Sequence, residues 1–194
     1  MNFIYLHGFQ SSPQSAKGQL LKHYIENKTP YHIDLPDLNK PPRQVLQQLQ
    51  QQLQHQPKTV LIGSSLGGFY ATQLAARYHI AAAVINPVIQ PWLLFQQLFA
   101  DCPLPYHVTP NWCLDQTQLQ DLQDLALPFV QDASKLLVLL QQGDEVLDYR
   151  EAQRYYSQTT HQSFIMTDNH GNHAMDDFIV KIPMIVQFLS DSIA

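Results

Sequence analysis

The stretch Thr59–Tyr78, TVLIGSSLGGFYATQLAARY, decides the fold. An apolar run ends in GSSLG at Gly63–Gly67, and an Ala- and Leu-rich helical pattern follows at once. A Gly-x-Ser-x-Gly motif between a strand and a helix is typical of the nucleophile elbow, a sharp turn that presents a serine at the top of an α/β sheet. Its glycines lack a Cβ, so strand and helix can approach closely. The segment predicts a serine hydrolase with Ser65 as nucleophile.

The motif has two other interpretations. A glycine-rich turn between a strand and a helix can carry a serine without any chemical role. A phosphate-binding loop has the form G-x-x-x-x-G-K-[ST], and the lysine of that pattern is missing here. The strand before the motif and the helix after it favour the nucleophile elbow over both.

Length and composition suit one domain, residues 1–194, with a sizeable core: 45% of the residues are hydrophobic and 14% are charged. The net charge of −5, without a basic cluster, argues against a nucleic-acid partner. No apolar run approaches the ~20 residues of a membrane span, and the chain opens directly into a predicted strand rather than a signal peptide. Cys102 and Cys113 are interpreted as reduced thiols of a cytoplasmic protein, although one disulfide between them stays open.

Short apolar runs alternate with helical patterns along the chain, which predicts a mostly parallel six-stranded sheet covered by helices on both faces. The expected strands are Asn2–Leu6, Tyr31–Leu35, Thr59–Gly63, Ala81–Asn86, Lys135–Gln141 and Gln162–Thr167. Besides the elbow helix, the expected helices run from the Ser12–Pro13 cap to about Glu26, from Pro41–Pro42 to about His55, from about Val146 to Ser157, and from Ala174 to Ser190 with Pro183 inside.

Two segments need separate comment. The glutamine-rich stretch Gln44–Gln56 carries Val45, Leu46, Leu49 and Leu53 on one helical face, so we expect an amphipathic helix rather than a disordered tract. The interval 87–134 is too long for a structureless loop in a compact domain and is rich in aromatic residues. It predicts a small helical lid, whose aromatics either pack on the sheet or line an acyl pocket.

A serine needs a base, usually a histidine that a carboxylate orients, and in this kind of sheet the acid and then the histidine follow the serine along the chain. Asp144 is the first carboxylate after the strand Lys135–Gln141, with Asp148 and Glu145 as alternatives. His173 and His170 both follow the last strand, and His173 directly precedes the expected final helix. A zinc site at the two histidines and a nearby Asp ranks well below a base, because it lacks a clear third ligand.

The loop after the first strand supplies the remaining part of the predicted site. It reads His7-Gly8-Phe9, and hydrolases of this kind take one oxyanion donor from a backbone N–H of this loop. We expect the N–H of Phe9 in that role and the N–H of Leu66, next to the serine, as the second donor. His7 is expected to be a structural residue.

Five short motifs carry a resemblance to a known superfamily. They are HGF at His7–Phe9, D-x-P at Asp34–Pro36, GSSLGG at Gly63–Gly68, GDEVLD at Gly143–Asp148 and GNHA at Gly171–Ala174. In this order they resemble the α/β-hydrolase superfamily. Longer segments look like the small bacterial YqiA-type esterases, namely Tyr5–Leu21, Leu61–Thr72, Ile85–Pro91, Leu139–Ala152 and Gly171–Phe178.

The resemblance implies a compact three-layer α/β-hydrolase fold that lacks the first two strands of the larger fold. It implies that Ser65, Asp144 and His173 form the catalytic triad. Asp144 is favoured over Asp148 because the superfamily carries its acid as D-x-V-V, which Asp144–Leu147 matches. His170 stands where relatives usually carry glycine, which favours His173 as the base.

We therefore predict a serine esterase that hydrolyses carboxylic esters of small or medium acyl groups through an acyl-enzyme. Its partner is a small-molecule ester or thioester, with no metal, organic cofactor, nucleic acid or membrane insertion, and the sequence leaves the oligomeric state open. One alternative is an acyl-thioesterase or another acyl hydrolase on the same triad. Another is a non-catalytic binding module, because a fold alone does not determine a function.

Overall fold

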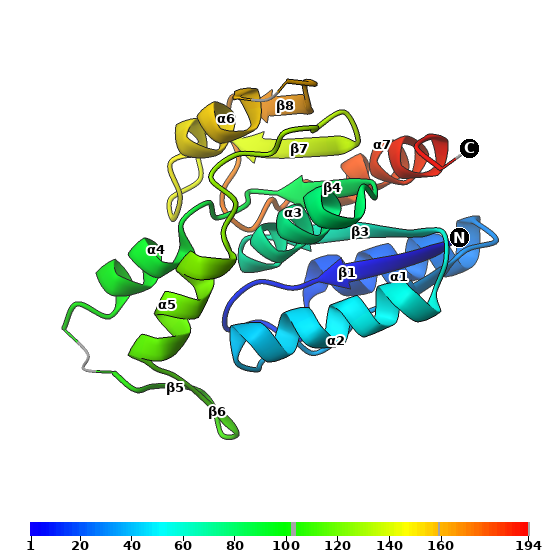
Figure 1. Cartoon of the computed structure of the whole chain (residues 1–194). Helices are drawn as coiled ribbons and strands as arrows, with labels where there is room; N and C mark the ends of the chain where they lie inside the picture. The colour runs from blue at the N-terminus through cyan, green and yellow to red at the C-terminus, as the bar shows by residue number, and fades with distance from the viewer. Residues whose placement is uncertain (102–103, 159, 194) are drawn as a thin grey trace.

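A computed structural model describes residues 1–101, 104–158 and 160–193. Its main sheet has six strands in the order β2-β1-β3-β4-β7-β8, and every pairing in it is parallel (Figure 1). The strands are β1 (Asn2–Leu6), β2 (His32–Asp34), β3 (Thr59–Ser64), β4 (Ala82–Ile85), β7 (Leu136–Gln141) and β8 (Phe164–Asp168). The six predicted strands are confirmed to within two residues at either end. Cys102 lies outside the described residues, so the thiol state of the two cysteines stays a prediction.

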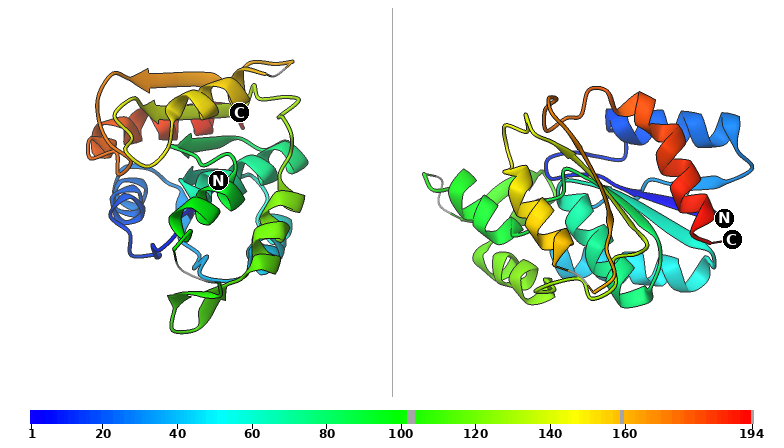
Figure 2. Two further views of the ribbon diagram at one scale, coloured as in Figure 1. Left: turned by 90° about the vertical axis from the view of Figure 1, so that its left-hand side faces the viewer. Right: turned by 90° about the horizontal axis from the view of Figure 1, so that it is seen from above.

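Helices cover both faces of the sheet and complete the three predicted layers (Figure 2). One face carries α1 (Ala16–Lys28) and α7 (Phe178–Asp191), and the other carries α2 (Pro42–His55), α3 (Leu66–Tyr78) and α6 (Tyr149–Ser157). Successive strand residues point to opposite faces. In β1, for example, Phe3 and Tyr5 pack toward α1 and α7, while Ile4 and Leu6 pack toward α2 and α3. Burial on both faces explains why the strands read as nearly continuous apolar runs.

The strand order reverses direction next to β1, and this reversal positions the site. The chain passes from β1 through α1 to β2 at the edge, and then returns through α2 to β3 on the other side of β1. Helices α1 and α2 consequently lie on opposite faces, which opens a crevice at the carboxyl ends of β1 and β3. The loop His7–Phe9 follows β1 there, and Ser65 follows β3.

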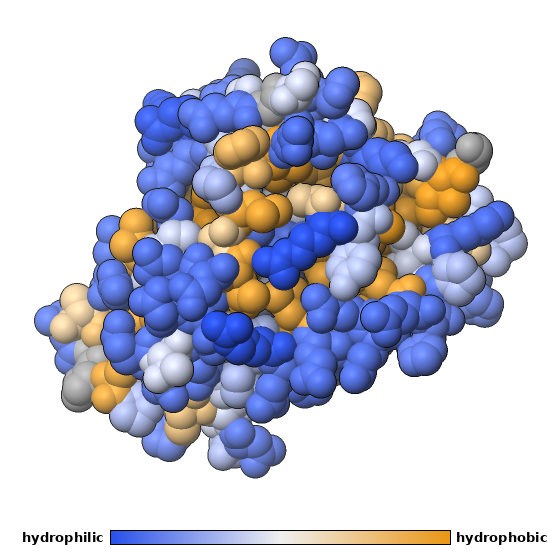
Figure 3. All heavy atoms as spheres, viewed as in Figure 1, coloured by the Kyte–Doolittle hydropathy of each residue, from blue (hydrophilic) through white to orange (hydrophobic). Residues whose placement is uncertain are grey.

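The structure of α2 confirms the amphipathic helix predicted for the glutamine-rich stretch. Val45, Leu46 and Leu49 are buried, while most of the glutamines of α2 are partly or fully exposed. Figure 3 shows the face of the molecule that is turned to the viewer in Figure 1. Hydrophilic side chains cover most of that face, and hydrophobic ones gather in the hollow at its centre. No helix in the described ranges is long and apolar enough to cross a membrane.

The segment after β4 contains two helices and a hairpin, beyond the carboxyl ends of the strands (Figure 1). They are α4 (Pro91–Leu98), the antiparallel pair β5 (Tyr106–Thr109) and β6 (Trp112–Leu114), and α5 (Gln116–Leu125). Helices were expected in this segment, whereas the short hairpin between them was not predicted. The hairpin strands have only four and three residues, too short for alternation to distinguish them from loop.

The start of α1 differs from its prediction because Ser15, not Ser12, is the N-cap. The Ser15 hydroxyl accepts a hydrogen bond from the N–H of Gly18, at 3.4 Å. The Ser12 hydroxyl instead accepts from the N–H of Gln14, and the Ser12 carbonyl accepts from the N–H of Ser15. These bonds form a separate turn, which local hydrogen bonding by serine favours.

Helices α6 and α7 also begin later than predicted, by three and four residues. Asp148 caps α6 by accepting from the N–H of Arg150, while the residues before it are held by Asp144. Before α7, Met175 has a φ of 50°, in the left-handed region, which interrupts any helix that starts at Ala174. Both delays arise in the loops that carry the predicted acid and base.

We predict that Gly67→Ala destabilises the protein by about 1–3 kcal/mol, the usual range for overpacking. A Cβ at this position would run into the backbone carbonyl of Leu6, which the sheet holds in place. Gly18→Ala is the matched control, because its Cβ would meet no backbone atom and its nearest neighbour would be the end of the flexible Leu35 side chain. Urea denaturation measures both. Equal losses in the two variants would contradict the argument.

Candidate active site

The backbone at Ser65 has the geometry of a sharp turn between β3 and α3. Its φ is 54° and its ψ is −117°, a strained conformation for a residue with a Cβ. The Ser65 N–H donates to the carbonyl of Ile85 at 3.0 Å, and its carbonyl accepts from Phe69 and Val88. Strain of this kind persists only where the surrounding structure enforces it. Here the hydrogen bonds to strand β4 and to helix α3 hold Ser65 in this conformation.

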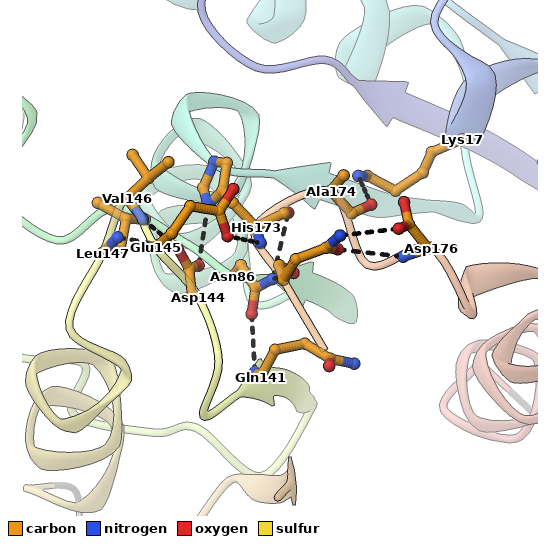
Figure 4. Close-up of polar contacts among 11 residues, drawn as sticks. Lys17, Asn86, Gln141, Asp144, Glu145, Val146, Leu147, His173, Ala174 and Asp176 are labelled. Atoms are coloured by element: carbon orange, nitrogen blue, oxygen red, sulfur yellow. Dashed lines mark hydrogen bonds and ion pairs between the residues drawn. The ribbon is translucent and has the colours of Figure 1, made fainter. Parts of the chain in front are cut away.

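His173 and Asp144 meet across the loops that follow β8 and β7 (Figure 4). The ring Nδ1 of His173 lies 2.8 Å from Oδ2 of Asp144, whose side chain is only 2% exposed. The other carboxylate oxygen accepts from the N–H groups of Val146 and Leu147, at 2.9 and 2.8 Å. Because an ionised carboxylate can only accept, the ring proton lies on Nδ1, and Nε2 is left as an acceptor.

The two alternative acids, Glu145 and Asp148, make different contacts. Glu145 points at the same loop, where its Oε2 accepts from the backbone N–H of His173 at 3.0 Å. Asp148 caps α6 and forms an ion pair with Arg150. Of the three carboxylates weighed from the sequence, Asp144 is thus the one in contact with the histidine ring.

Ser65, His173 and Phe9 line one pocket of about 430 Å³. Gly8 brings the loop after β1 against the serine, because a Cβ on Gly8 would lie 3.2 Å from the Cβ of Ser65. The Phe9 ring packs on Phe95 of α4, with ring centroids 4.5 Å apart, and on Trp112 of β6. The segment inserted after β4 therefore holds the loop that borders the serine.

The neighbouring His7 is buried and occupied on both ring nitrogens. The N–H of Leu38 donates to its Nε2 at 3.0 Å, so the proton lies on Nδ1, which donates to the carbonyl of Gly8 at 2.9 Å. Burial lowers the pKa of His7, despite the opposing effects of the Gly8 carbonyl and Asp37. A neutral, saturated imidazole fits the predicted structural role.

Two polar groups that the sequence did not single out line the same pocket. Lys17 reaches from α1 to the carbonyl of Ala174 at 2.5 Å, and burial lowers its pKa although Asp176 and Asp144 act to raise it. Burial also raises the pKa of the Tyr5 hydroxyl to about 12. A lysine near the start of a predicted helix carries no distinguishing signal in the sequence, so only the packing of α1 reveals its place at the pocket.

His170 does not lie with Ser65, Asp144 and His173. It is exposed and lines a separate hollow with Asp168 and Asn169. In the described part of the chain, no group of three or more histidine, cysteine, aspartate or glutamate side chains is arranged to hold a metal ion.

The model of the uncharacterised protein family UPF0227 matches residues 2–190. The chain belongs to UPF0227. This UPF0227 chain also superposes on solved structures from other organisms, all at low sequence identity.

One is the alpha/beta hydrolase domain-containing protein 10 from mouse, with a TM-score of 0.73 and 13% identity over 97% of this chain and 90% of that one. Another is Est1E from Butyrivibrio proteoclasticus, with a TM-score of 0.73 and 15% identity over 99% and 88% of the two chains. A third is the esterase domain of a Rhodothermus marinus protein, with a TM-score of 0.72 and 15% identity over 100% and 88%. These likenesses show that the UPF0227 chain has the α/β-hydrolase fold.

The lowered pKa of His7 predicts a loss of stability in acid. A histidine whose pKa is lower in the folded state than in the unfolded state takes up its proton on unfolding, so stability falls as pH drops below about 6.5. His7→Gln removes this titration. We expect the free energy of unfolding to fall less steeply for His7→Gln than for the wild type between about pH 7 and pH 5. Identical slopes would refute the assignment.

Proposed function

We propose that the protein is a serine hydrolase that cleaves carboxylic esters with a triad of Ser65, His173 and Asp144. The observation that carries the proposal is the 2.8 Å contact between His173 Nδ1 and the buried Asp144, with His173 and Ser65 lining the same pocket. The α/β-hydrolase fold and structural neighbours named as esterases support it.

The proposed reaction has two halves. The Ser65 oxygen attacks the ester carbonyl while His173 Nε2 accepts the proton of the Ser65 hydroxyl. His173 then gives that proton to the departing alcohol. A water molecule next gives a proton to Nε2 and attacks the acyl-enzyme, which releases the acid and returns the proton to Ser65. Throughout, Asp144 holds the ring in its Nδ1–H tautomer and stabilises the imidazolium.

The backbone N–H groups of Phe9 and Leu66 are the proposed oxyanion donors. Leu66 is the first residue of α3, where a helix leaves N–H groups without intrahelical partners and the helix dipole favours negative charge. Phe9 lies in the loop that Gly8 brings against Ser65. Donors fixed in this way need no reorganisation when the charge develops.

The pocket supports a small-molecule substrate with a small or medium acyl group. Its volume is about 430 Å³, and Leu20, Met175 and Phe178 supply apolar lining beside the polar Lys17 and Ser11. We interpret residues 87–134 as the lid of a domain spanning 1–194, since its aromatics contact Phe9 at the pocket. Thioester cleavage on the same triad and simple binding without turnover are the rival functions.

The first prediction concerns the nucleophile. A fluorophosphonate probe should label Ser65, and Ser65→Ala should abolish both labelling and ester hydrolysis, because the Ser65 hydroxyl is the proposed nucleophile that forms the acyl-enzyme. Peptide mapping by mass spectrometry identifies the labelled residue. Labelling elsewhere, or undiminished labelling of Ser65→Ala, would refute the triad.

The second prediction distinguishes the acids. Asp144→Asn should lower kcat by about 10⁴-fold, since an amide in place of the carboxylate no longer fixes the correct tautomer. Asp148→Asn is the matched control, because asparagine caps a helix as well as aspartate does. Its kcat should stay close to that of the wild type. A large loss in Asp148→Asn with little loss in Asp144→Asn would reverse the assignment.

The third prediction concerns the substrate class. We expect kcat/KM to be higher for oxygen esters of graded acyl length than for matched acyl-thioesters or amides, with a maximum at short or medium acyl chains. A spectrophotometric assay on the three series measures this. A thioester preference would favour the thioesterase, and ligand binding without any acyl-enzyme would favour the binding module.

A further inference from the structure

Asn86 occupies an unusual position directly after β4. It is buried, with 3% of its surface exposed, and its φ of 39° lies in the left-handed region that asparagine tolerates better than most residues. Its own N–H donates to the carbonyl of Leu139 in β7 at 2.9 Å. The residue before it, Ile85, accepts the N–H of Ser65. The strand end that supports the nucleophile therefore continues directly into Asn86.

The Asn86 side chain joins the loops of the proposed acid and base (Figure 4). Its Oδ1 accepts from the backbone N–H of Gln141, the last residue of β7, at 3.0 Å. Its Nδ2 donates to the backbone carbonyls of Asn172 and His173, at 3.1 and 3.3 Å. One amide thus ties the strand that leads into Asp144 to the backbone that carries the His173 ring.

Given the proposed triad, on which this inference rests, we propose that Asn86 is a positioning residue that sets the distance between Asp144 and His173. An amide has both an acceptor and two donor hydrogens, and all three partners are backbone groups. A side chain that only accepts or only donates hydrogen bonds cannot bind all three of these backbone groups. Asn86 acts through the backbone of the two loops and does not line the pocket among the described residues.

Other side chains also hold the base loop, but their bonds are open to solvent. Glu145 accepts from the His173 N–H at an exposed site, and the half-buried Lys17 donates to the Ala174 carbonyl, where the bond itself is open to solvent. Water can replace a lost partner there. At the buried Asn86, removal of the amide leaves the buried N–H of Gln141 and the two part-buried carbonyls of the base loop without this partner, which is unfavourable wherever water cannot take its place. The loop would then shift to find new partners.

The experiment compares two substitutions with a matched control. Asn86→Gly removes the amide but accepts the left-handed backbone without strain. Asn86→Asp keeps the shape and the acceptor for Gln141, yet in either protonation state it lacks at least one of the two donor hydrogens. Lys58→Gly is the control, since Lys58 also has a positive φ, of 59°, but lies exposed in the loop that precedes β3.

We expect both Asn86 variants to lower kcat for ester hydrolysis by about 10- to 100-fold, the cost of misplacing a catalytic group by about 1 Å. KM should change little, and Lys58→Gly should keep the wild-type kcat. The hydrogen-bonded ring N–H resonance of His173 in NMR spectra should shift or broaden in the Asn86 variants. A merely structural role would lower the melting temperature without moving that resonance in the folded protein.

The outcomes separate this inference from the proposed function. Wild-type kcat and an unchanged His173 resonance in a folded Asn86 variant overturn the positioning role while the triad stands. Absence of turnover and of Ser65 labelling in the wild type refutes the proposed function, and the His173 resonance then still decides whether Asn86 holds the ring. A loss confined to KM also overturns the inference. If Asn86→Gly fails to fold, Asn86→Asp supplies the same readouts.

Discussion

The close contact between the end of β1 and the start of α3 is the constraint on which the rest of the site depends. Gly67 lies directly against the backbone carbonyl of Leu6, and Gly63 lies against the backbone of Gly67. With any side chain at these positions, α3 could not begin so near the sheet, and Ser65 could not adopt its positive φ at the strand end. The same approach brings Gly8 next to the serine, so one steric condition forms both the elbow and the loop beside it.

The site is assembled from loops, but each loop is fixed by the sheet beneath it. Parallel strands bring their carboxyl ends to one edge, and the reversal of strand order beside β1 opens that edge to a substrate. The amide of Asn86 then links the ends of β4 and β7 to the loop after β8. The buried Asn86 amide is satisfied by backbone partners, so the sheet largely sets the relative position of the proposed acid and base.

Much of the fold was predictable because its signals are local. Burial on both faces makes the central strands β1, β3, β4 and β7 nearly continuous apolar runs, and the glycine pattern of Gly63–Gly67 marks a turn that few other sequences can form. The boundaries of α1, α6 and α7 were missed for a physical reason. Ser12, Asp144 and Asn172 bind nearby backbone N–H groups in turns, and such side chains compete with the helix for the same donors. The β5–β6 hairpin was missed because strands this short show no periodicity.

The sequence by itself determined the class of the fold, the identity of the elbow serine and the order in which a carboxylate and a histidine follow it. These are properties of short segments whose conformations depend mainly on their own residues. Only the tertiary structure decided which carboxylate meets His173, that Glu145 and Lys17 hold the same loop, and that Asn86 bridges two strand ends. Such contacts join residues far apart in the chain, so they depend on how the helices pack the strands into register and not on any local pattern.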